Sequence, residues 1–167
     1  MRPTLRASYE VLILNTRLFL NCLDGVDDRN AQFRLTRDTN HMAFVACHLV
    51  DARFYLGTYL GLGLENPLRD RLEGVRTIDE LQDCPRLDEI RWAWRYVSEK
   101  LAARFQVLSD EDLIPDGLQT FPIADKSVLG GIAFLLQHDS YHVGQLGFLR
   151  KALGFPPMSY DISHDMS

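Results

Sequence analysis

The sequence predicts an all-α fold, a four-helix bundle with long crossover connections, formed by a single domain over residues 1–167. Apolar residues recur at three- and four-residue spacing over four long segments, as in helices that bury one face. No segment of strand length alternates apolar and polar residues in a way that competes with these helices. The connections at about 61–84 and 109–126 are long enough to cross the bundle and place parallel helices side by side.

The first two helices follow from this spacing and from capping residues. The first is predicted over 4–23, and a polar loop over 27–38 follows it. Thr39 and Asn40 are both good N-caps, so the second helix is expected to begin at one of them. Its apolar pattern then continues to about Leu60.

The second half of the chain predicts one short helix and two long ones. A capping box predicts the short helix, at about 77–83. Pro85 suits the first turn of the third long helix, whose apolar stripe extends to Leu108. The fourth helix is expected from Ser127 to Leu153, and its first half is apolar almost all round. It should therefore be the most buried of the four.

Charge and cysteine content exclude several classes of function. The formal net charge is −5 and no run of Lys or Arg appears, which argues against a nucleic-acid partner. The sequence has no basic amphipathic segment and no apolar run long enough to span a bilayer, which argues against a membrane partner. Cys22, Cys47 and Cys84 are odd in number and lack CxxC spacing, so we interpret them as reduced thiols of a cytoplasmic protein.

The five histidines are the most informative polar residues. His138 and His142 lie four residues apart, so consecutive turns of the fourth helix present both rings on one face. His48 lies on the apolar face of the second helix, and the three rings are expected to meet inside the bundle. His41 lies two turns before His48, near a helix start where exposure to solvent is expected. Spacing favours His48 and leaves His41 as a replacement or support, while His164 is interpreted as a mobile surface residue.

Three neutral imidazoles are a common ligand set for a divalent metal ion. A zinc protease is excluded, because Asp139 follows His138 where that motif needs glutamate. The alternative is a structural dimer with buried histidines that hydrogen bond to one another. Asp139 is expected in an ion pair or as an acceptor for a ligand ring. Four further residues are candidates for a pocket or for support of the ligands: Asp51, Tyr55, Tyr141 and Gln145.

The pairing of His48-Leu49 with His138-Asp139-Ser140-Tyr141-His142-Val143-Gly144-Gln145-Leu146 resembles the DinB-like family, also called DinB/YfiT-like metalloenzymes. The resemblance implies a DinB-like four-helix bundle with a long crossover, often a homodimer. It also implies a divalent metal ion, commonly zinc or nickel. Matched residue by residue, the implied ligands are His48, His138 and His142.

Characterised members of this family include thiol transferases that use bacillithiol or glutathione-like cofactors, and a related mycothiol-dependent isomerase. The resemblance thus implies a metal-dependent enzyme, such as a low-molecular-weight-thiol S-transferase acting on a small-molecule substrate. The alternative is a non-catalytic, stress-related bundle that binds a metal or a ligand. The ligand set alone does not distinguish a bound thiolate from a bound water that attacks a substrate.

Overall fold

The computed structural model describes residues 1–113 and 120–161. Within these ranges every regular element is helical, which confirms the predicted all-α fold. Four helices are long enough to build a bundle: α1 (Arg6–Leu23), α3 (Met42–Tyr59), α5 (Leu87–Val107) and α6 (Val128–Ala152). No helix in the described ranges combines the length and apolar character that a membrane span requires.

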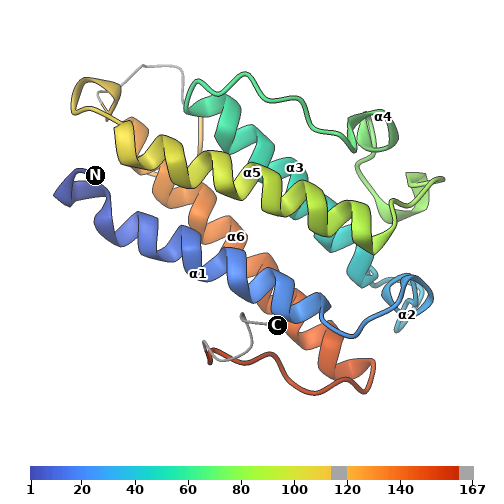
Figure 1. Cartoon of the computed structure of the whole chain (residues 1–167). Helices are drawn as coiled ribbons and strands as arrows, with labels where there is room; N and C mark the ends of the chain where they lie inside the picture. Colours follow the sequence, from blue (N-terminus) through green and yellow to red (C-terminus); the bar gives the residue numbers. More distant parts are fainter. Residues whose placement is uncertain (114–119, 162–167) are drawn as a thin grey trace.

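The four long helices pack with α6 between α1 and α3, and with α5 between the same two helices on the other side. Figure 1 shows that α1 and α6 run in one direction while α3 and α5 run in the other. The segment between α3 and α5, residues 60–86, therefore returns along the length of the bundle before α5 begins. This crossover confirms the predicted long connection and the parallel neighbours that it permits.

Two helix starts differ from the sequence prediction. His41, rather than Thr39 or Asn40, is the N-cap of α3, because its Nδ1 atom accepts the backbone N–H of Phe44 at 3.0 Å. His41 is consequently buried, and the expected exposure at this helix start was wrong. Pro85 lies before the first turn of α5 rather than within it.

The start of α5 is shifted because two carboxylates satisfy backbone donors there. Asp28 Oδ1 accepts the N–H of Leu87 at 2.7 Å, and a Glu89 carboxylate oxygen accepts the N–H of Arg86 at 2.8 Å. Unpaired N–H groups at a helix start are stabilised by such acceptors. Glu89 belongs to α5, but Asp28 caps the helix from outside, and the local sequence does not reveal that acceptor.

The connections contain short elements. The expected polar loop over 27–38 includes α2 (Asp28–Ala31), and the crossover includes α4 (Arg69–Leu72). The helix expected at 77–83 is only a 3-10 turn, η2 (Ile78–Glu80), although its predicted capping box is present. Two further 3-10 turns are η1 (Pro3–Leu5) and η3 (Glu111–Leu113).

The centre of the bundle contains an ion pair among apolar side chains. Arg53 on α3 is fully buried, and its Nε atom donates to Asp139 Oδ2 on α6 at 2.6 Å. Its Nη1 atom donates to Thr16 on α1 and to Ser98 on α5, each at 2.8 Å. The guanidinium also lies over the ring of Trp94, 4.0 Å from its centroid. One side chain thus bonds to all the other long helices and fixes how they are aligned.

Candidate metal centre

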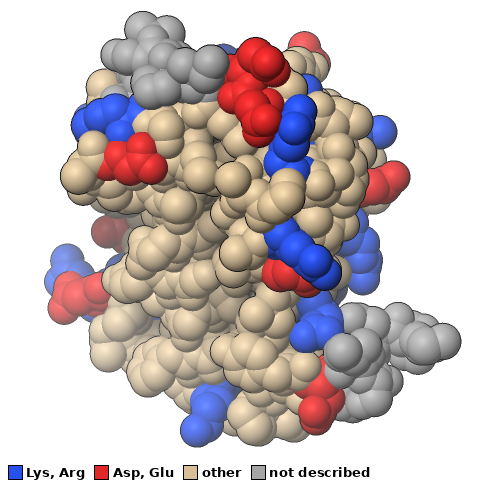
Figure 2. All heavy atoms as spheres, turned by 90° about the vertical axis from the view of Figure 1, so that its left-hand side faces the viewer, with Lys and Arg blue, Asp and Glu red and all other residues tan. Residues whose placement is uncertain are grey.

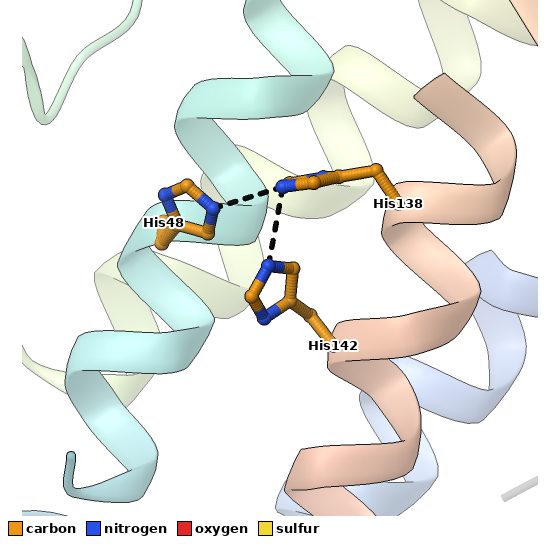
Figure 3. A group of neighbouring side chains, drawn as sticks. All are labelled: His48, His138 and His142. Carbon is orange, nitrogen blue, oxygen red and sulfur yellow. Dashed lines mark hydrogen bonds between the residues drawn. The ribbon is translucent and has the colours of Figure 1, made fainter. Parts of the chain in front are cut away.

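Three imidazole rings converge where α3 packs against α6. His138 Nε2 lies 3.0 Å from His48 Nε2 and 3.1 Å from His142 Nε2. Figure 3 shows the ring of His48 directed from α3 toward the two rings of α6. The fold therefore brings together the three residues that the sequence nominated as ligands.

The three rings lie at the edge of the helix interface, not inside the bundle as expected. His48 is exposed, whereas His138 and His142 are partly buried. The difference arises because α3 and α6 bury Leu49 and Val50, and Asp139 and Val143, toward the core. The histidines lie at one side of these positions, so the cluster opens to solvent.

A cavity of about 250 Å³ adjoins the cluster on the side of the crossover connection. Phe44, Cys47 and Asp51 of α3 line it together with His48 and His142. Leu72, Val75 and Arg76 close it from the crossover. A second cavity of about 480 Å³ shares Asp51, Leu72, Val75 and Arg76 with the first, so a continuous cleft extends along α3.

Gln145 fixes the orientation of one ring. Its Oε1 atom lies 2.7 Å from His142 Nδ1, one turn earlier on α6, and its amide nitrogen donates to Tyr141 Oη at 3.3 Å. A carbonyl oxygen accepts only, so Nδ1 of His142 holds the proton in this contact and Nε2 retains its lone pair. Partners of this kind orient metal-binding histidines in proteins.

The surroundings favour neutral rings. Desolvation by the atoms packed around the ring, followed by the neighbouring His142 and His138 rings, lowers the pKa of His48 to about 4. Burial, followed by His142, also lowers the pKa of His138. Imidazole binds metal in its neutral form, so these shifts leave ligand nitrogens available at neutral pH.

The arrangement fits a divalent ion. Two metal–nitrogen bonds of about 2.0–2.1 Å at a tetrahedral angle hold their nitrogens about 3.3 Å apart. The observed contacts of 3.0 and 3.1 Å approach that spacing. Three imidazole donors would leave coordination positions for water or a substrate atom, as in catalytic rather than closed structural sites.

The other nominated residues lie at various distances from the cluster. Asp51 lines both cavities and accepts a hydrogen bond from Asn66 at 3.1 Å. Tyr55 lies further along the cleft, with its ring edge-on to Phe121. The ring of Tyr141 contacts that of His142 edge-on, with centroids 4.9 Å apart.

His41 is not part of the cluster, and its Nδ1 atom caps α3. His164 lies outside the described residues. Asp139 pairs with Arg53 rather than with a ligand ring, which agrees with the ion-pair interpretation of this residue.

Sequence reasoning missed Arg53, Cys47 and Arg76. A signal existed for Arg53, because it is a charged residue on the face of α3 that also carries Leu49 and Leu56. A charge on an apolar stripe predicts a buried partner. Arg76 gave no such signal, because it belongs to the irregular crossover.

The family model described as DinB superfamily matches residues 12–146, a range that includes all three histidines of the cluster. No curated protein matches the chain.

Proposed function

The chain belongs to the DinB superfamily, and on this premise we propose that it is a divalent-metal-dependent enzyme that transfers a low-molecular-weight thiol to a small electrophilic substrate. The observation that carries the proposal is the convergence of His48, His138 and His142 beside an open cleft. Zinc and nickel both suit imidazole ligands.

A bound divalent ion supplies positive charge that stabilises a thiolate, the nucleophilic form of a thiol, at neutral pH. The residues of the chain have separate tasks around it. His48, His138 and His142 would hold the ion, and the hydrogen bond between Gln145 and His142 Nδ1 would fix the orientation of that ring. Phe44, Leu72 and Val75 give the cleft apolar side chains that would contact a bound substrate.

The metal is tested first. Protein purified without a metal-affinity tag is expected to contain stoichiometric zinc or nickel by elemental analysis, and His138→Ala is expected to lose it. His41→Asn is the matched control, because it changes a histidine of the same bundle that only caps α3. Absence of stoichiometric metal in the wild type, or full metal in His138→Ala, would contradict the proposal.

The reaction is tested on metal-loaded protein with bacillithiol, mycothiol and glutathione against a panel of electrophiles. Turnover with one thiol, lost in His138→Ala and kept in His41→Asn, is expected. Stoichiometric metal without any thiol turnover would contradict the enzyme proposal. It would point instead to the non-catalytic metal- or ligand-binding bundle.

The proposal also includes a homodimer and a cytoplasmic location, where cellular thiols are kept reduced. In Figure 2, charged side chains lie around the margins of this face on all sides, and a broad central area carries none. On α6, exposed positions without charge recur along one side of the helix: Ala133, Gln137, Tyr141, Gly144 and Phe148. Light scattering coupled to size exclusion tests the dimer, with Phe148→Glu expected to weaken it.

A further inference from the structure

One arginine of the crossover lines the cleft without a carboxylate partner. The crossover contains four arginines, and three of them, Arg69, Arg71 and Arg86, form ion pairs at 3.3, 2.7 and 3.3 Å. The fourth, Arg76, forms no ion pair within the part of the chain that the structure describes. Its guanidinium therefore keeps N–H donors available for a ligand.

The position of Arg76 relates it to the histidine cluster. Arg76 lines both cavities of the cleft, and it is the only Lys or Arg among the described residues around the smaller one. His48 and His142 line that same cavity, so a small molecule bound there would contact their rings and the guanidinium together. The other crossover residues of this cavity, Leu72 and Val75, are apolar. The charge of Arg76 is thus the feature of this wall that can select a polar group of a ligand.

The turn that carries Arg76 is fixed by its own backbone. Gly74 adopts a φ of 78°, a left-handed conformation that glycine reaches without strain. A Glu80 carboxylate oxygen accepts the N–H of Arg76 at 2.6 Å and the N–H of Thr77 at 3.0 Å. This carboxylate therefore binds the backbone of the turn and not the guanidinium. Because the backbone at Arg76 is already ordered, less entropy is lost when a ligand binds.

Asp51 adds the opposite charge to the same cleft. It lines both cavities, as Arg76 does, and the two side chains form no ion pair with each other. One of its carboxylate oxygens accepts a hydrogen bond from Asn66 at 3.1 Å, which orients the group. Opposite charges that line one cleft without pairing are complementary to a ligand that carries both an ammonium group and a carboxylate.

We propose that Arg76 determines which low-molecular-weight thiol the protein accepts, by binding a carboxylate of the thiol whose sulfur lies at the histidine cluster. This role rests on the thiol chemistry proposed above. The planar guanidinium matches a carboxylate through two parallel hydrogen bonds. Bacillithiol and glutathione each carry carboxylates and an ammonium group, whereas mycothiol carries neither. The cleft should therefore select one of the first two thiols over mycothiol.

The test measures binding, not turnover, by calorimetry on the full-length protein as purified. The probes are the S-methyl derivatives of bacillithiol, glutathione and mycothiol, because a methylated sulfur cannot form a thiolate. At least one of the two carboxylate-bearing probes is expected to bind roughly tenfold more tightly than the mycothiol probe, since charge-assisted hydrogen bonds are strong. Esterification of the carboxylates of that probe should weaken its binding by a similar factor.

Variants assign this preference to one side chain. Arg76→Gln should bind the acid and its ester about equally, and Arg76→Lys should keep part of the preference, because an ammonium group retains the charge but not the planar fork. Arg69→Gln is the matched control, because Arg69 lines the same cleft but is already paired with Glu73. It should keep the wild-type preference. Thermal melts followed by circular dichroism check that each variant is folded.

Three results would overturn the role of Arg76: neither carboxylate-bearing probe binds more tightly than the mycothiol probe, esterification leaves the affinity unchanged, or Arg76→Gln keeps the wild-type preference. These results are distinct from failure of the proposed enzyme, which metal content and turnover decide. Turnover of mycothiol as efficient as that of the other thiols would refute the selection by Arg76 and leave the enzyme. Arg76-dependent binding in a protein without stoichiometric metal would refute the enzyme and leave the carboxylate site.

Discussion

Removal of the carboxylate of Asp139 is expected to destabilise the bundle more than a typical substitution. Arg53 and Asp139 are 0% and 3% exposed in their side chains, and their Nε and Oδ2 atoms lie 2.6 Å apart. Burial raises the pKa of Asp139 and lowers the pKa of Arg53, and the pairing between them opposes both shifts. Taking two charges out of water is costly, so removing one partner of a buried pair is strongly destabilising, whereas replacing both with apolar residues is often tolerated.

Single and double substitutions of the pair should therefore differ in their effect on the free energy of unfolding. Asp139→Ala leaves the guanidinium charged and without its carboxylate, which should lower the free energy of unfolding by about 3–5 kcal/mol. For a chain of this size the melting temperature should fall by roughly 10 °C. Asp139→Asn keeps an oxygen acceptor for Arg53 Nε and should be less destabilised. The double variant Arg53→Met/Asp139→Leu removes both charges and should be more stable than Asp139→Ala.

The assay is equilibrium unfolding in urea, followed by circular dichroism, with chelator present so that metal binding does not contribute. A loss below about 1 kcal/mol for Asp139→Ala would refute the reasoning, because it would match an ordinary exposed ion pair. A double variant Arg53→Met/Asp139→Leu that is less stable than Asp139→Ala would also refute it. The same variants, loaded with metal, should bind it more weakly, because the pair aligns α3 with α6 next to the three histidines.

Four further outcomes are expected. Gln145→Leu should weaken metal affinity roughly 10–100-fold by calorimetry, because a ligand ring loses its orienting partner; an unchanged affinity would contradict that role. Burial lowers the pKa of His41 from 6.5, so the unfolded chain binds more protons and stability of the metal-free protein falls as pH drops below 6.5. His41→Asn retains a cap and should show a shallower decline in urea titrations between neutral and acidic pH, whereas a slope equal to wild type would count against the cap. Gly131→Ala should destabilise the protein by about 1–3 kcal/mol, because its new methyl group would overlap the side chain of Tyr59. Gly144→Ala meets nothing within 4 Å and should stabilise by about 0.5–1 kcal/mol in thermal melts.

The sequence by itself determined the helical class and the residues with metal-binding chemistry. Helical periodicity and the Ser127 cap located α6 within a residue at each end, because these signals depend on near neighbours in the chain. The spacing of His138 and His142 placed them on one helix face for the same reason. Local capping signals did not locate the start of α5, because Asp28 from a distant segment accepts the N–H of Leu87 there.

Only the tertiary structure decided where the rings meet and what surrounds them. Periodicity shows which face of α3 is apolar, but the angle at which α3 packs on α6 decides that His48 lies at an open edge. The pairing of Arg53 with Asp139 joins residues distant in the chain, and no local pattern encodes such a contact. The sequence determined the chemistry of the ligands, because that belongs to single side chains. The packing of helices decided their access and alignment, because those properties exist only once distant segments come together.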